Sequence, residues 1–247
     1  MQGRRFGLGQ PSWAALHGFT GSGCAFDRVQ QFLPGTRWLP DLPGHEGQLM
    51  PEGVDRFEAL TEFVGSRLRA ELPPPRLLLG YSMGGRLGVA AWMRDPELFV
   101  GAVLVGVHPG GLKAPARDRR AKEDAERAEE LHRDPVGFLR AWDQRPMFGP
   151  RPPLPRSRID GPQLARALLA SSLADMPDCR AFLDQGVEEA RVSLLVGEHD
   201  EEFRRLWGRM ATIVDGAHHD VLSQRPEVVR VAARALWNRL EVRILQD

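Results

Sequence analysis

Residues 77–86 read LLLGYSMGGR, an apolar run that breaks into a glycine-rich turn around a serine. The three leucines predict a strand that is buried on both faces, as a parallel sheet requires. The largely apolar residues 87–93 predict a helix that ends near Asp95, since the residue before a proline disfavours helical backbone. The glycines of the turn lack the Cβ atoms that would clash where the strand doubles back on the helix. We therefore expect the hydroxyl of Ser82 to be exposed on a sharp strand-to-helix turn, the geometry of a nucleophile elbow.

Short apolar runs alternate with helical patterns along most of the chain. The expected strands cover residues 13–16, 37–39, 77–79, 102–105, 192–196 and 211–214, and helices are expected at residues 24–33, 54–72, 87–93 and 226–240. Strand-to-helix-to-strand crossovers of this kind imply an α/β fold, a mostly parallel sheet with helices on both faces. Ligands of such folds bind at the carboxyl edge of the sheet.

The pattern changes between residues 109 and 185, where no buried strand is expected and the charge density rises. Helices are predicted at residues 117–133, 135–143 and 164–173, with a proline-dense loop at 146–155. We predict that residues 1–108 and 186–247 form the α/β core and that residues 109–185 form a helical cap inserted over its carboxyl edge. The alternative for residues 117–133 is a plain solvated helix crossed by i,i+4 ion pairs.

The composition excludes several classes of protein. The chain has 247 residues, with 33 basic and 33 acidic side chains, so nothing steers it generally toward nucleic acid or an anionic membrane surface. Its two cysteines are too few for a disulfide framework, and its first residues contain no apolar core of a signal peptide. No uninterrupted apolar stretch approaches the roughly 20 residues that cross a bilayer. We expect a cytoplasmic protein that binds neither nucleic acid nor membrane.

Polar residues follow the two late strands of the predicted sheet. Asp200 comes shortly after the strand at 192–196, and His219 comes after the strand at 211–214. The order Ser82, Asp200, His219 is the order of nucleophile, acid and histidine in the α/β-hydrolase fold. A serine hydroxyl is not ionised at neutral pH, so a neutral imidazole must take its proton and a carboxylate must fix the imidazole tautomer. We predict that these three residues form a catalytic triad.

Two positions of this triad have competitors in the sequence. His219 is preferred to His218 because Pro226, the expected start of the last helix, follows His219 by seven residues. His218 stays open as the alternative base. Asp200 is preferred because it lies three residues after the glycine that ends its strand. Its competitors are Glu198, Glu201 and Asp215.

A glycine-rich loop at residues 17–23 follows the first expected buried strand. Such a loop can aim a backbone N–H into a site at the carboxyl edge, and Phe19 is the candidate donor. The backbone N–H of Met83, at the start of the helix after Ser82, is the second candidate for stabilising an oxyanion. His45, in a later loop, is assigned a structural role in holding that loop rather than a catalytic one.

Four motifs carry a resemblance to a known family. They are HGFTGS at 17–22, DLPGH at 41–45, GYSMGGR at 80–86 and GEHDEEF at 197–203. Together they resemble the 2-succinyl-6-hydroxy-2,4-cyclohexadiene-1-carboxylate (SHCHC) synthases of menaquinone biosynthesis, which belong to the α/β-hydrolase superfamily. The resemblance covers almost the whole chain, the cap included. It implies a carbon–oxygen lyase that eliminates pyruvate from 2-succinyl-5-enolpyruvyl-6-hydroxy-3-cyclohexene-1-carboxylate, with Ser82 as the base that removes a ring proton.

A substrate with several carboxylates calls for several arginines. Arg86 lies one helical turn after Ser82, near enough to meet a carboxylate, although it is equally placed to cap its own helix. The resemblance implies further substrate-binding roles for Tyr81, Arg120, Trp142 and Arg158, with Arg156 as the alternative to Arg158. Core packing is the competing explanation for Trp142.

The main alternative function is a carboxylesterase or carbon–carbon bond hydrolase that uses Ser82 as a true nucleophile. Arginines around the site discriminate the two, since an esterase of neutral substrates has no reason to bury guanidinium groups. A binding module without catalysis is a third possibility, and the intact Ser, Asp and His order speaks against it. We expect a small polycarboxylate as the ligand, no cofactor, no metal ion, and a monomer or homodimer.

Overall fold

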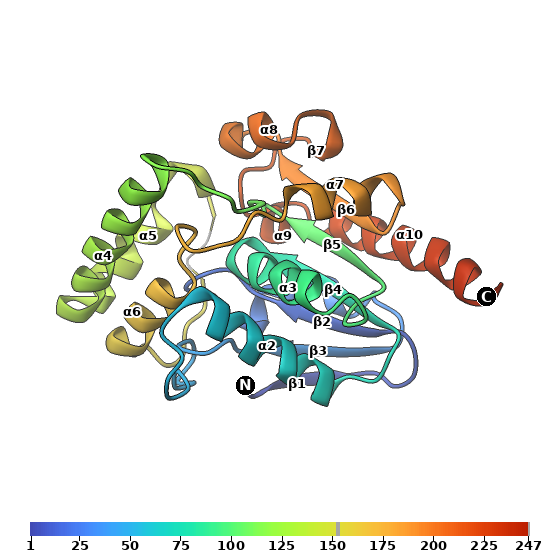
Figure 1. Ribbon diagram of the computed structural model, residues 1–247, viewed down its shortest axis with the longest axis horizontal. Coiled ribbons are helices and arrows are strands. Elements are labelled where there is room, and N and C mark those ends of the chain that lie inside the picture. The colour runs from blue at the N-terminus through green and yellow to red at the C-terminus, as the bar shows by residue number, and fades with distance from the viewer. Residues whose placement is uncertain (152–153, 247) are drawn as a thin grey trace.

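The computed structural model describes residues 1–151 and 154–246 and contains a seven-stranded sheet in the order β1-β3-β2-β4-β5-β6-β7 (Figure 1). The strands are β1 (Gly3–Phe6), β2 (Ser12–Leu16), β3 (Thr36–Pro40), β4 (Arg76–Tyr81), β5 (Gly101–Val105), β6 (Val192–Gly197) and β7 (Thr212–Val214). All neighbouring pairs are parallel except β1 with β3. The predicted mostly parallel sheet is therefore confirmed.

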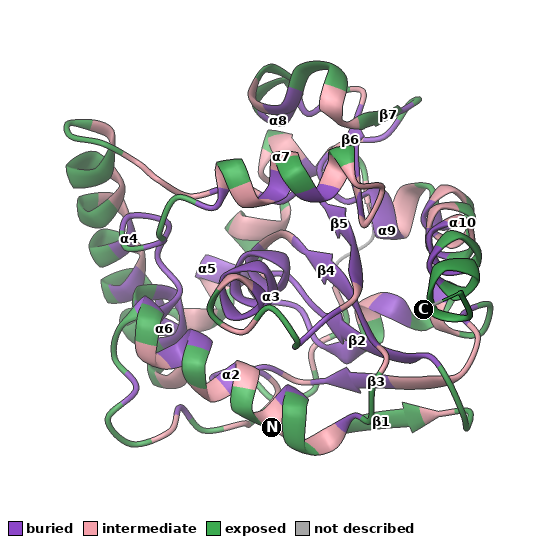
Figure 2. Ribbon diagram, turned by 45° about the vertical axis from the view of Figure 1, so that its right-hand side comes forward, coloured by how far each residue is buried: buried purple, intermediate pink, exposed green. Residues whose placement is uncertain are grey.

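The central strands are buried because helices cover both faces of the sheet. The helices of this part are α1 (Asp27–Gln30), α2 (Phe57–Glu71), α3 (Ser82–Arg94), α7 (Arg180–Glu188), α8 (Glu201–Trp207), α9 (Val221–Gln224) and α10 (Pro226–Ile244). Along β4, Leu78 packs with α2 and α3, whereas Leu77 and Leu79 pack with α10 on the other face. This alternation of buried side chains explains why β4 reads as an uninterrupted apolar run. Figure 2 shows β2, β4 and β5 buried along their length and β1 largely exposed.

Three helices form a separate group beyond the carboxyl ends of the strands (Figure 1). They are α4 (Ala116–Arg133), α5 (Pro135–Asp143) and α6 (Gly161–Ala170). Leu131 on α4, Phe138 on α5 and Leu164 on α6 belong to one apolar cluster that is distinct from the two clusters of the sheet. We call α4, α5, α6 and the loop between α5 and α6 the cap. The division of the chain at residues 109 and 185 stays a prediction, and α7, which begins at Arg180, packs against β6.

The cap helices begin where the local sequence caps them. The side chain of Asp134 accepts a hydrogen bond from the backbone N–H of Gly137, and Pro135 occupies the first turn of α5. Asp160 does the same for the N–H of Gln163 at the start of α6. Within residues 1–151 and 154–246, no helix has both the length and the apolar character of a membrane span.

Candidate active site

The site is built on the turn between β4 and α3. Helix α3 begins at Ser82 directly after β4, and Ser82 has a φ of +47°, in the left-handed region that residues with a side chain seldom adopt. A Cβ atom on Gly84 would lie 2.4 Å from the backbone carbon of Leu16, and one on Gly85 would lie 2.3 Å from a methyl of Val107. Only glycines allow α3 to approach β2 and β5 this closely. The tight turn expected around Ser82 is present.

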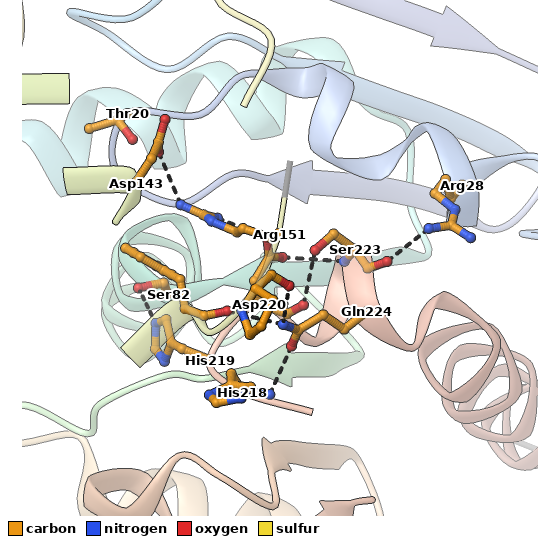
Figure 3. Close-up of polar contacts among 12 residues, drawn as sticks. Thr20, Arg28, Ser82, Asp143, Arg151, His218, His219, Asp220, Ser223 and Gln224 are labelled. Carbon is orange, nitrogen blue, oxygen red and sulfur yellow. Dashed lines mark hydrogen bonds and ion pairs between the residues drawn. The ribbon is translucent and has the colours of Figure 1, made fainter. Parts of the chain in front are cut away.

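Ser82, His219 and Asp200 form a continuous hydrogen-bonded chain. His219 Nε2 lies 3.1 Å from Ser82 Oγ, and His219 Nδ1 lies 2.7 Å from Asp200 Oδ2. Figure 3 shows the contact between Ser82 and His219. Because a carboxylate accepts only, it places the imidazole proton on Nδ1 and leaves the Nε2 lone pair toward Ser82. His219 and Asp200 are 2% and 4% exposed, so their contact is shielded from water, whereas Ser82 is partly exposed to the cavity.

The competitors from the sequence lie elsewhere. His218 turns away from Ser82: its ring lies 4.8 Å from that of His199, and its backbone N–H donates to Gln224 Oε1. Among the four candidate carboxyl groups, Asp200 is the one bonded to His219. The other three are the partly buried Glu198 and the exposed Glu201 and Asp215.

Phe19 and Met83 both line the cavity in which Ser82 lies. The backbone N–H of Gly84 donates to the carbonyl of His17 at 3.0 Å, which ties the loop after β2 to the first turn of α3. The two candidate oxyanion donors are thereby held on adjoining segments. Their assignment as donors stays a prediction.

Two buried histidines hold the loop that carries Phe19. His17 Nε2 accepts from the N–H of Leu42, and His45 Nε2 accepts from the N–H of Thr20. Burial lowers the pKa of His17 to about 3 and that of His45 to about 4, so both rings are neutral at pH 7. The position of His45 agrees with the structural role expected for it.

A cavity of about 370 Å³ lies between the carboxyl edge of the sheet and the cap. Ser82, His219 and Tyr81 line it from the sheet side, and Trp142 and Phe148 line it from the cap side. Arginine dominates the charged lining. The lining arginines are Arg86, Arg119, Arg120, Arg127 and Arg145, against the acids Glu123 and Glu202. The cavity thus carries an excess of positive charge that favours an anionic ligand.

Arg86 is the most buried of these arginines, at 8% exposure. Its Nη1 donates to the carbonyl of Ser171 at 2.7 Å, and within the described part of the chain it has no acidic partner. Burial, followed by the nearby charge of Arg120, lowers the pKa of Arg86 to about 9, so it is still charged at neutral pH. The charge of Asp124 acts on the pKa of Arg86 in the opposite direction, but the two do not form an ion pair, so Arg86 can pair with an anionic ligand.

Arg120 and Arg127 share the acid Asp124 on the same helix, and Arg127 also pairs with Glu123. Asp124, 1% exposed, accepts from Arg120 Nε at 2.8 Å, from Arg127 Nη1 at 2.8 Å and from the hydroxyl of Ser172 at 2.8 Å. Arg120 uses only Nε in this contact, which leaves its two terminal nitrogens for another acceptor. Asp124 therefore orients Arg120 without blocking it.

Trp142 both lines the cavity and packs within the cap, and its role in substrate binding stays a prediction. Its ring lines the cavity and also packs against Phe138 and, edge to face, against Phe19 at a centroid distance of 5.3 Å. The guanidinium of Arg145 lies 4.6 Å from the centroid of the Trp142 ring. Trp142 therefore connects the cap to the loop of Phe19.

Several lining residues were not predicted from the sequence, among them His108, Arg127 and Arg145. Arg127 lies seven residues after Arg120, two helical turns along the same face, so helical spacing could have found it. His108 follows β5 closely, and the ends of parallel strands meet at this edge. Burial and then Arg86 and Arg120 lower the pKa of His108 to about 4. Its Nδ1 accepts from a backbone N–H, so the neutral ring carries its proton on Nε2. No sequence signal distinguishes Arg145.

Arg158 is not brought to the cavity. It is exposed and lies against Gly47, because the backbone N–H of the preceding residue, Ser157, is fixed to the carboxylate of Glu46. Arg156, the alternative, turns inward and bonds to Asp143 and Thr20. Neither side chain lines the cavity.

Tyr81, the only tyrosine, is buried and lines the cavity, with its ring 5.6 Å from that of His219. Burial raises the pKa of Tyr81 well above its ordinary value, and the charge of Asp220 acts in the same direction. Its hydroxyl therefore stays protonated and able to donate.

The parallel sheet, the turn at Ser82 and the Ser–His–Asp chain define an alpha/beta hydrolase. A model of the alpha/beta hydrolase family matches residues 15–232, and the chain belongs to that family. A curated relative from Enterobacter sp. (strain 638), named 2-succinyl-6-hydroxy-2,4-cyclohexadiene-1-carboxylate synthase, is 31% identical over 96% of this chain and 94% of its own. A relative of the same name from Escherichia coli O1:K1 / APEC is 33% identical over 88% of this chain and 90% of its own. The resemblance to this group of enzymes is confirmed.

Solved structures show the same fold. MenH from S. aureus superposes with a TM-score of 0.80 at 18% identity, covering 96% of this chain and 98% of its own. An esterase from Exiguobacterium antarcticum superposes with a TM-score of 0.66 at 15% identity, covering 95% and 94%. At these identities the likeness speaks for the architecture alone, and the protein is an enzyme on the strength of its closer sequence relatives.

Proposed function

We propose that the protein is an SHCHC synthase of menaquinone biosynthesis, a lyase that eliminates pyruvate from 2-succinyl-5-enolpyruvyl-6-hydroxy-3-cyclohexene-1-carboxylate. The observation that carries the proposal is the cavity in which the Ser82–His219–Asp200 chain faces several arginines. The names of the sequence relatives support it. A polycarboxylate is the ligand whose charge matches this lining.

In this reaction Ser82 acts as a base. Its proton passes to His219 Nε2 as its oxygen removes the ring hydrogen beside a carboxylate, and Asp200 stabilises the imidazolium that forms. The electron pair of the broken C–H bond at C2 forms a C2=C3 double bond, the ring double bond of the substrate shifts from C3=C4 to C4=C5, and the bond from C5 to the enolpyruvyl oxygen breaks. The leaving enolate takes up a proton to give pyruvate. Backbone N–H groups of Phe19 and Met83 stabilise the negative charge that develops on the succinyl carbonyl oxygen, which is conjugated with C2.

The arginines bind and orient the substrate. Arg86 takes a carboxylate close to the reacting carbon, since it follows Ser82 by one helical turn and lacks an acidic partner among the described residues. Arg120 and Arg145 take carboxylates on the cap side of the cavity. Residues 109–185 act as the cap that closes this cavity over the substrate and excludes water.

The rival function is hydrolysis of an ester or a carbon–carbon bond with Ser82 as nucleophile. The Ser82–His219 contact suits that chemistry equally well. Arg86 favours the lyase, because a neutral substrate would leave its charge buried without an ion-pair partner.

The test is to supply the purified enzyme with the enolpyruvyl substrate and to follow pyruvate by a coupled lactate dehydrogenase assay. We expect stoichiometric pyruvate, and none from Ser82→Ala. Absence of pyruvate from the folded wild-type enzyme, together with hydrolysis of simple esters, would replace this proposal by the rival one.

A further inference from the structure

A chain of buried ion pairs joins the cap to the segment that carries His219. Arg151, in the loop between α5 and α6, donates from Nη1 to Asp220 Oδ2 at 2.8 Å and from Nη2 to Asp143 Oδ1 at 3.1 Å. The side chains of Arg151 and Asp220 are 2% and 4% exposed. Figure 3 shows Arg151 between Asp143 and Asp220.

The chain continues to the loop that carries Phe19. Arg156 donates to both carboxylate oxygens of Asp143, at 2.7 and 2.8 Å. Its Nε also donates to the carbonyl of Thr20 at 2.8 Å, and its Nη2 donates to the Thr20 hydroxyl at 2.9 Å. We call Asp220, Arg151, Asp143 and Arg156 the ionic bridge. One end of the bridge follows His219 in sequence, and the other holds the residue after Phe19.

Further contacts bind the same segments together. The backbone N–H of His219 donates to the carbonyl of Met147 at 3.0 Å, so the cap loop touches the histidine backbone directly. The guanidinium of Arg151 lies 3.8 Å from the ring centroid of Phe148, whose ring lies 6.0 Å from that of His219. Arg151 thus contacts a cavity-lining aromatic as well as the two acids.

Stability alone does not account for this arrangement. Burying charges is costly, and apolar residues of similar volume are often as stable as a buried ion pair. The contribution of the ionic bridge is geometric. Each of its ion pairs fixes the relative orientation of two segments that are far apart in sequence. Its two arginines and two aspartates cancel in charge, so it leaves the positive field of the cavity to the lining arginines.

We propose that Arg151 is a positioning residue: its two ion pairs hold the cap loop, the His219 segment and the Phe19 loop in the one arrangement that aligns Ser82 with His219. The triad of this enzyme therefore depends on a side chain contributed by the cap. The kinetic part of the test rests on the proposed function, whereas the structural part does not.

The test compares Arg151→Met, which keeps length and removes charge, with wild type. We expect hydrogen exchange of peptides covering residues 17–26, 143–151 and 216–225 to rise together, because the ionic bridge connects the three segments and Arg151 is its central link. We expect kcat for pyruvate release to fall by about tenfold or more, since small misplacements of catalytic groups are costly. KM should change by less than about threefold, and Arg151→Lys should restore part of kcat.

A matched control is Arg76→Met. Arg76 is also a buried arginine, but it lies at the first residue of β4, and Ser82 follows the other end of that strand. The Nε of Arg76 donates to the backbone carbonyl of Leu72. This variant should lose thermal stability and keep both kcat and the exchange of the three segments. If Arg151→Met fails to fold, Arg151→Met with Asp220→Asn replaces it, because Asp143 keeps Arg156 and no carboxylate is left unpaired.

Two results would overturn the inference. One is exchange that rises in the cap peptide alone, or in none of the three. The other is a kcat for Arg151→Met equal to that of Arg76→Met. If the wild-type enzyme releases no pyruvate, the proposed function is wrong. The hydrogen exchange of the three segments then tests the positioning role of Arg151 without the kinetic measurement.

Discussion

At the scale of single residues, the contacts of Ser82, His219 and Asp200 lead to a first prediction. Ser82→Ala, Asp200→Asn and His219→Ala should each lose most turnover, with losses that do not add, because the three groups act as a unit. Circular dichroism should show all three folded. His218→Ala is the matched control and should keep its activity, since the ring of His218 points away from Ser82. Loss of activity in His218→Ala instead of His219→Ala would reverse the assignment of the base.

The role of the Ser82 oxygen gives a second prediction. As a base it never bonds to substrate carbon, so intact-protein mass spectrometry of a reaction quenched within the first turnovers should find no adduct. An esterase that acylates faster than it deacylates would show a burst and a trappable ester on Ser82. Substrate mass found on Ser82 would therefore exclude the lyase mechanism. Ser82→Ala supplies the blank for adducts at other sites.

The unpaired charge of Arg86 gives a third prediction. Arg86→Ala should raise KM for the polycarboxylate by an amount equivalent to roughly 2–5 kcal/mol, because it leaves a substrate carboxylate without its partner in a partly dry cavity. Arg94→Ala, on the same helix but paired with Glu58 at the surface, should leave KM unchanged. If hydrolysis of a neutral ester is detectable, Arg86→Ala should affect it little. Equal losses on both substrates would indicate damage to the fold.

At the scale of the elements, the close approach of α3 to β2 leads to a fourth prediction. Gly84→Ala places a Cβ 2.4 Å from the backbone of Leu16, which cannot move without shifting β2. We expect a destabilisation of about 1–3 kcal/mol or more, together with loss of activity as the turn at Ser82 is displaced. Gly9→Ala is the control for backbone strain alone: unlike Gly84, Gly9 has a positive φ of +87°, but nothing lies within 4 Å of the added methyl, so this variant should keep its activity. Urea denaturation and the pyruvate assay measure the two effects.

Elements with a clear apolar period were predictable from the sequence. The helix expected at 54–72 is α2, and the strand at 102–105 is β5, each to within a few residues. The edge strand β1 was missed because its sequence, GRRF, is mostly polar and shows no apolar pattern. It forms a strand through antiparallel pairing with β3. Helix α8 was missed because it has only seven residues.

The residues of the candidate site also differ in how far the sequence could predict them. Ser82, Asp200 and His219 were predictable because each follows a strand that the apolar pattern reveals, and strand ends of a parallel sheet converge. Arg145 and the ionic bridge were not, because they depend on how the cap loop folds back over the sheet. Arg158 was expected at the cavity from a resemblance, but the anchoring of Ser157 on Glu46 directs it to the surface.

At the scale of the whole molecule, buried neutral histidines couple stability to pH. Burial lowers the pKa of His17 to about 3, and those of His45 and His108 to about 4, from an ordinary 6.5. Between about pH 6.5 and 4 the unfolded chain therefore binds protons that the folded chain does not. Uptake of protons favours unfolding in this window. Above pH 6.5 the rings are neutral in both states, and their contribution to stability is fully present.

A fifth prediction follows for the free energy of unfolding. It should fall as the pH drops from 6.5 to 4, with each of the three histidines contributing up to about 1.4 kcal/mol per pH unit. Urea titrations at a series of pH values measure the slope. His45→Gln should lower stability at pH 7 because it disturbs the bond to Thr20, and should also reduce the slope by the share of one proton. The exposed His132 is the matched control, and His132→Gln should leave the slope unchanged. A slope that is the same in both variants would assign the acid sensitivity to groups other than the buried histidines.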